Sequence, residues 1–196
     1  MRVMSIKLLP FASIACLAAM SAGCGEFIRQ DRTSGILVID VLEAASGAEA
    51  TATFTGTLQS DVVTGGVFSD AGRVTLRVIS KDLAHPIRPT NTVTITRYRV
   101  TFRRTDGRNT PGVDVPHPFD SALTFTVASA SSGITQSFEL IRHVAKLEPP
   151  LLGLRNNPVV ISTVADVTFF GRDQAGRETS ATGSIGVQFG NFADPD

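Results

Sequence analysis

The segment Val167-Thr-Phe-Phe-Gly-Arg-Asp173-Gln-Ala-Gly176-Arg-Glu178, followed by alternating apolar residues at 185–189, decides the fold of this chain. Apolar residues at every second position are typical of strands that bury one face. Asp173 can accept hydrogen bonds from the backbone of its own turn, and Gly176 can adopt a positive φ. The segment therefore predicts a β-hairpin near the end of the chain.

Further strands are predicted along the chain, some from alternating apolar residues and others from continuous apolar runs. Residues 36–42 are apolar apart from Asp40, which is typical of a strand buried on both faces or lying at the centre of a sheet. Shorter strands are expected at residues 52–58, 74–78, 123–127, 136–144, 159–161 and 167–169. No stretch after Gly35 shows a sustained helical period. Eight or nine short strands separated by turn residues predict a β-sandwich or barrel.

The longest strand candidate, residues 91–104, changes phase partway along its length. Val93 and Ile95 fall on one face, whereas Tyr98 and the apolar residues after it fall on the other. A slip of one residue moves a whole apolar set across a sheet, so we expect a bulge near Thr96 and Arg97. Such a bend could carry the strand from one sheet to its partner.

The closing hairpin resembles the last strand pair of bacterial immunoglobulin-like and fibronectin-III-like domains, in which an Asp-x-Ala-Gly turn joins the final two strands. This resemblance rests on about 25 residues at 167–189. It implies an immunoglobulin-like β-sandwich over residues 36–196, with long loops and no catalytic residue. The chain has no tryptophan, which excludes the Cys–Trp–Cys set of antibody domains.

The N-terminus has the three parts of a secretory signal. Arg2 and Lys7 precede an apolar segment at 8–20, and small residues follow it. Ser21-Ala22-Gly23-Cys24 resembles the lipobox of bacterial lipoproteins, although the family prefers leucine at the position of Ser21. The resemblance implies that residues 1–23 are a cleaved signal peptide.

In lipoproteins the lipobox cysteine is diacylated, with palmitate among the acyl chains, and becomes the mature N-terminus. The resemblance therefore implies that Cys24 is the lipidation site and that residues 24–35 form a lipidated tether. Gly25, rather than aspartate, follows the cysteine, which implies export to the outer membrane. Ordinary secretion and an uncleaved membrane anchor remain as alternatives for this segment.

Composition narrows the classes of function. Apolar residues make up 42% of the 196 residues and charged residues 18%, which is typical of a folded globular protein. The formal net charge is 0, so we expect no nucleic-acid partner. The three histidines lack metal-ligand spacing, and no nucleotide-binding loop or nucleophile elbow occurs. We therefore predict no cofactor, no metal and no catalytic residue.

Five arginines cluster between residues 97 and 108: Arg97, Arg99, Arg103, Arg104 and Arg108. Arg97, Arg99 and Arg103 share parity, so on a regular strand they would face outward together. Two interpretations remain open. The row is either a solvated sheet face that blunts edge-to-edge aggregation, or a site for an anionic partner such as lipid headgroups or an acidic polysaccharide.

The Pro- and Gly-rich loop Thr105–Asp120 is the candidate surface for partner contact, because long loops in compact domains are often functional. Three prolines and the apolar Val113, Val115 and Phe119 predict a rigid loop pinned onto the sandwich. The predicted contact residues are Asp106, Arg108, Asn109, Asp114 and His117. The loop also offers side-chain oxygens of the kind that Ca²⁺ takes, on Asp106, Asn109, Asp114 and Asp120, although EF-hand spacing is absent.

Together these features predict a lipid-anchored cell-envelope protein that acts without catalysis as a binding or scaffolding module. Its partners would be the membrane, through the N-terminal lipid, and a protein or glycan of the envelope. One alternative is a carbohydrate- or calcium-binding sandwich that serves adhesion or a secretion assembly. Another is a hydrolase whose site is assembled from scattered loop carboxylates.

Overall fold

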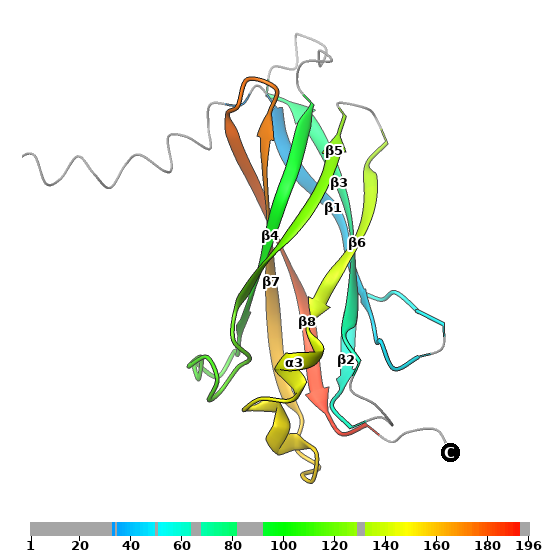
Figure 1. Cartoon of the computed structure of the whole chain (residues 1–196), viewed down its shortest axis with the longest axis vertical. Helices are drawn as coiled ribbons and strands as arrows, with labels where there is room; N and C mark the ends of the chain where they lie inside the picture. The colour runs from blue at the N-terminus through cyan, green and yellow to red at the C-terminus, as the bar shows by residue number, and fades with distance from the viewer. Residues whose placement is uncertain are drawn as a thin grey trace, which may run out of the picture.

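The computed structural model describes residues 33, 35–49, 51–63, 68–81, 92–128 and 132–192. Two β-sheets pack face to face in an elongated sandwich (Figure 1). The strands are β1 (Gly35–Ala45), β2 (Thr57–Asp61), β3 (Asp70–Ser80), β4 (Val93–Arg103), β5 (Phe119–Val127), β6 (Ile134–Ile141), β7 (Ile161–Asp173) and β8 (Glu178–Gly190). Two single-turn helices, α3 (His143–Lys146) and η2 (Leu151–Leu154), lie between β6 and β7.

The strand order identifies the sandwich as immunoglobulin-like. One sheet has the order β1-β3-β6, and the other has the order β2-β8-β7-β4-β5. Apart from the short β2, which pairs in parallel with β8, these orders match A-B-E and G-F-C of the immunoglobulin fold. β5 lies beside β4, in the position of the additional strand of variable-type domains. The predicted all-β, immunoglobulin-like sandwich is therefore confirmed, with eight strands in the described residues.

The core forms where alternating side chains of the two sheets meet. Tyr98 on β4 is 2% exposed, and its ring lies 5.1 Å from that of Phe138 and 6.1 Å from that of Phe169. Its hydroxyl donates to the carbonyl of Glu139, at 2.8 Å, and so links the two sheets. Burial raises the pKa of Tyr98. β4 corresponds to strand C of the immunoglobulin fold, and Tyr98 fills the place on it that tryptophan takes in antibody domains.

The predicted bulge in β4 is present. The pairing of β4 with both β5 and β7 shifts register between Ile95 and Arg97. Both Ile95 and Tyr98 consequently point into the core, at 0% and 2% exposure. The expectation that this bend could move the strand between sheets is wrong, because β4 pairs with β7 on both sides of the bulge.

The predicted closing hairpin is also confirmed. Asp173 Oδ1 accepts hydrogen bonds from the backbone N–H groups of Ala175 and Arg177, at 3.0 and 2.8 Å. Gly176 has φ +76°, a conformation that an L side chain rarely adopts. One aspartate and one glycine thus fix the reversal between β7 and β8.

Four strand predictions differ from the structure. The strand expected at residues 52–58 begins only at Thr57, as β2, and before it Thr55 forms an isolated bridge with Ala44. β1 is an edge strand rather than a central one, because it pairs in the sheet only with β3, and Ile36 and Val41 are 44% and 42% exposed. β6 ends at Ile141, before the start of α3, so Val144 is not in a strand. The strands expected at 159–161 and 167–169 are parts of one strand, β7, which begins at Ile161 and leaves Val159 and Val160 outside it.

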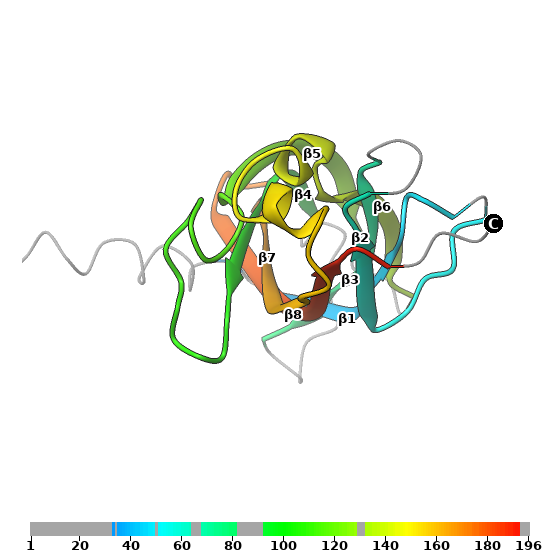
Figure 2. The same ribbon diagram turned by 90° about the horizontal axis from the view of Figure 1, so that it is seen from below.

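The two ends of the sandwich carry different structures (Figure 1). The chain enters β1 at Gly35 at one end, next to the β7–β8 turn. The β4–β5 connection and the α3–η2 segment lie at the opposite end, which is seen from below in Figure 2. We call this the distal end; it comprises residues 104–118 and 142–160.

Candidate functional site

The predicted contact loop is at the distal end and is shorter than expected. Residues 104–118 connect β4 to β5, whereas Phe119 and Asp120 already belong to β5. An isolated bridge between Pro111 and Val115 closes a small turn inside the loop. The loop is therefore folded on itself rather than extended.

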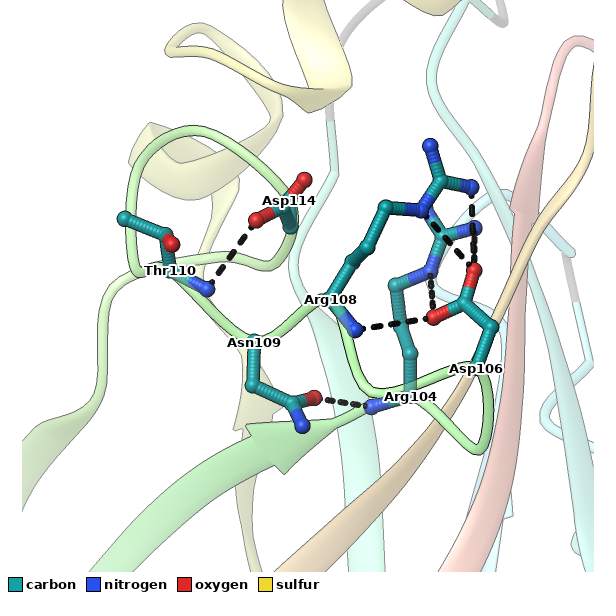
Figure 3. Close-up of polar contacts among 6 residues, drawn as sticks. All are labelled: Arg104, Asp106, Arg108, Asn109, Thr110 and Asp114. Carbon is teal, nitrogen blue, oxygen red and sulfur yellow. Dashed lines mark hydrogen bonds and ion pairs between the residues drawn. The ribbon is translucent and has the colours of Figure 1, made fainter.

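Two guanidinium groups hold one carboxylate at the start of the loop (Figure 3). Asp106 Oδ2 lies 2.6 Å from Arg104 Nη2 and 2.9 Å from Arg108 Nη2. Asp106 Oδ1 also accepts the backbone N–H of Arg108, at 3.1 Å. The hydrogen bond from Arg104, followed by those from Arg108, lowers the pKa of Asp106 to about 2. This carboxylate is ionised and already paired with cations at neutral pH.

Asn109 and Asp114 also bond within the loop (Figure 3). Asn109 Oδ1 accepts the backbone N–H of Arg104 at 2.6 Å, and Asp114 Oδ2 accepts that of Thr110 at 3.1 Å. The carbonyl of Thr110 accepts the N–H of Asp114 in return, at 2.8 Å. The predicted contact residues thus come together in one loop, and three of them use side-chain oxygens to shape it.

The expected apolar anchoring of the loop is correct for two of its three residues. Val115 and Phe119 are 1% and 8% exposed and belong to the core. Val113 is 67% exposed and anchors nothing, because the turn closed by Val115 points it outward. His117 is exposed, and its imidazole lies over Gly112, where a β-carbon would be 2.4 Å from Nε2.

The outward row of arginines on β4 is present as its parity predicts. We call Arg97, Arg99 and Arg103 the arginine row; their side chains are 47%, 50% and 51% exposed. Arg97 and Arg99 both bind Asp120 on β5, at 2.9 and 2.8 Å. Arg103 binds Asp166 on β7, at 2.7 Å. The row therefore crosses the outer face of the five-stranded sheet as a network of ion pairs.

The distal end also exposes apolar side chains that the sequence did not single out. They are Val113, Val144, Leu147, Leu152, Val159 and Val160, with exposures between 40% and 67%. Leu151 and Leu154 of η2 are buried and hold the segment on the sandwich. These residues were missed for two reasons. The alternating pattern predicted a strand through Val144, and helices of four residues are too short to show a helical period.

No protein-family model matches the chain, and no curated protein is detectably similar to it. Cys24 and the rest of the predicted signal peptide and tether, apart from Thr33 and Gly35, lie outside the described residues. In the part of the chain that the structure describes, no helix is long and apolar enough to cross a membrane.

The geometry of the distal loop bears on the calcium alternative. Among the described residues, no group of three or more His, Cys, Asp or Glu side chains could hold a metal ion. Both oxygens of Asp106 already face guanidinium groups, so a cation would have to displace two positive charges. The paired oxygens of Asp106 therefore argue against a Ca²⁺ site at this carboxylate.

Proposed function

We propose that this protein is a lipid-anchored lipoprotein of the cell envelope, in the outer membrane, that acts without catalysis as a binding or scaffolding module. Lipid on Cys24 would attach the chain to the membrane, and the distal end would dock a partner protein. The observation that carries this proposal is that the distal end, which lies opposite the start of β1 (Figure 1), bears six exposed apolar side chains.

The direction of the tether supports this role. The chain enters the sandwich at Gly35, so a lipid at Cys24 would hold that end nearest the membrane. The sandwich would then present its distal end away from the bilayer (Figure 1). A surface in that position meets other proteins of the envelope rather than the lipid that anchors it.

The chemistry of the distal end supports a protein partner. Several exposed apolar side chains at one end of a folded domain are a feature of protein-binding sites. Arg108, whose side chain is 64% exposed, lies on the same end as the apolar group, and so does the half-buried Arg155. Interfaces combine an apolar centre with a polar rim, so the partner should offer apolar side chains bordered by carboxylates.

Site-specific photocrosslinking in cells tests the docking surface. A photoreactive phenylalanine analogue at Leu152 or Val159 should give one adduct of defined size. The same analogue at Val41, which is similarly exposed on β1, is the matched control and should give none. Leu147→Glu should remove the adduct from Val159 while leaving the melting temperature nearly unchanged. Equal crosslinking at Val41 and Val159 contradicts the proposal.

Metabolic labelling tests the anchor separately. Radioactive fatty acid should enter the wild-type protein and fail to enter Cys24→Ala. The protein should also fractionate with outer membranes, and the substituted form should be released from them. Equal labelling of both proteins contradicts the lipid anchor.

A further inference from the structure

The arginine row is long and open to solvent. Arg97 and Arg103 are six residues apart on β4, which corresponds to about 20 Å along an extended strand. The strand follows the long axis of the molecule (Figure 1), and about half of each side chain is exposed. The row therefore offers a line of cationic groups rather than a compact patch.

The carboxylates that pair with the arginine row do not use all of its N–H donors. Asp120 is shared by Arg97 and Arg99, and Arg99 alone engages both of its oxygens. Within the described residues Arg97 donates through Nη1 alone, and its guanidinium lies 3.6 Å from the centre of the Phe170 ring. Since a guanidinium carries five N–H donors, most of those on Arg97 remain for an external acceptor.

Hydroxyl groups lie on the same outer face of the sheet as the row. They belong to Thr124 and Thr126 on β5, Thr168 on β7, and Thr182 and Ser184 on β8. Thr168 and Thr182 are paired at 2.9 Å across strands. Exposed hydroxyls of this kind can exchange hydrogen bonds with the hydroxyls of a sugar chain.

We infer that the arginine row binds a linear acidic polysaccharide whose carboxylates lie along β4. Guanidinium groups match carboxylates in a planar, two-point geometry, and the flanking hydroxyls suit sugars. A bilayer would suit a broad basic patch near the tethered end, whereas this row runs lengthwise toward the distal end. The site lies on the side of the sandwich and does not depend on docking at the distal end.

Removal of the competing carboxylate gives the sharpest test. We would measure binding of the full-length chain, in nonionic detergent, to immobilised polygalacturonate and to neutral dextran. Asp120→Asn frees two guanidinium groups and should tighten binding to polygalacturonate about two- to fivefold, the factor expected for an exposed ion pair. Arg97→Gln combined with Arg99→Gln should weaken it at least about tenfold. Dextran should not bind.

Glu43→Gln is the matched control for the change in charge. Glu43 pairs with Arg73 at 2.6 Å on the other sheet, so this substitution adds the same charge on a different face. It should leave polygalacturonate binding unchanged. Equal tightening by Asp120→Asn and Glu43→Gln, or no loss in the double arginine variant, overturns the inference.

Vesicles of phosphatidylglycerol separate the polysaccharide from a lipid surface. We expect their binding to be the same for the wild type, Asp120→Asn and the double arginine variant. If vesicles instead follow the order of these variants and polygalacturonate does not, the row binds lipid headgroups and the inference is wrong.

Discussion

Lys146 Nζ lies 2.9 Å from Asp70 Oδ2, and the two side chains are only 1% and 0% exposed. Asp70 also accepts hydrogen bonds from Ser60 Oγ, at 2.6 Å, and from the backbone of Gly47, at 3.0 Å. One carboxylate thus joins β3 to β2, to the segment after β1 and to α3. This ion pair attaches the α3 segment of the distal end to the sandwich.

Loss of either partner should destabilise the fold strongly. Lys146→Met leaves a buried carboxylate without a cation and should lower the free energy of unfolding by about 3–5 kcal/mol. Asp70→Asn should cost a similar amount. The double variant should lose much less than the sum, because no unpaired charge remains. Urea unfolding of the four proteins measures this, and strictly additive losses would argue against a coupled pair.

The hydroxyl of Tyr98 should contribute separately from its ring. Tyr98→Phe keeps the aromatic packing but removes the hydrogen bond to Glu139, so it should cost about 1 kcal/mol in unfolding free energy. Thr182→Val removes an exposed hydroxyl pair with Thr168 and should change stability by less than about 0.5 kcal/mol. Equal effects of the two substitutions would show that the bond between the sheets contributes nothing.

The local sequence pattern was sufficient to predict most of the fold. Alternation located the strands, the phase change in residues 91–104 located the bulge, and Asp173 with Gly176 located the last turn. The edge position of β1 could not be predicted, because an apolar run does not say which strands pair with it. Some of the apolar side chains of β1 are buried in the core, and others are exposed at the edge of the sheet.

The location of the candidate site could be predicted from the sequence, but the hydrogen bonds and ion pairs within it could not. Length and proline content located the loop, but its side-chain partners depend on how the chain turns at Gly107 and Gly112, which have φ +82° and +76°. Lys146 and Asp70 are separated by 76 residues, and neither has a neighbouring motif. Contacts of that kind follow from tertiary packing, so no reading of spacing could have paired them.

Gly72 should resist replacement by alanine although alanine is the better strand residue. It lies opposite Phe138 in the β3–β6 pair, and a β-carbon there would be 2.3 Å from Cζ of that ring. Gly72→Ala should therefore displace the ring from Tyr98 and cost about 1–3 kcal/mol. Gly56→Ala is the control, since a β-carbon at that position meets nothing within 4 Å. Thermal unfolding compares them, and equal melting temperatures would contradict the packing described.

Acid should loosen the distal loop through Asp106. The pKa of this carboxyl is about 2 in the folded chain, against an ordinary value of 3.8. The folded state thus favours the ionised form, so its contribution to stability is complete above pH 3.8 and disappears as the pH falls toward 2. Asp106→Asn should therefore show a smaller fall in melting temperature than the wild type between pH 5 and pH 2, as measured by circular dichroism.

Part of the acid sensitivity should remain in Asp106→Asn, because the hydrogen bond from Arg99 also lowers the pKa of Asp120. Arg108→Gln separates the two contributions. It removes one of the two guanidinium groups on Asp106 and leaves Asp120 untouched, so the pKa of Asp106 should rise toward its ordinary value while that of Asp120 stays low. Carboxyl chemical shifts followed by NMR measure both groups in one titration. An Asp106 midpoint that does not move in Arg108→Gln would mean that Arg104 alone holds this carboxylate.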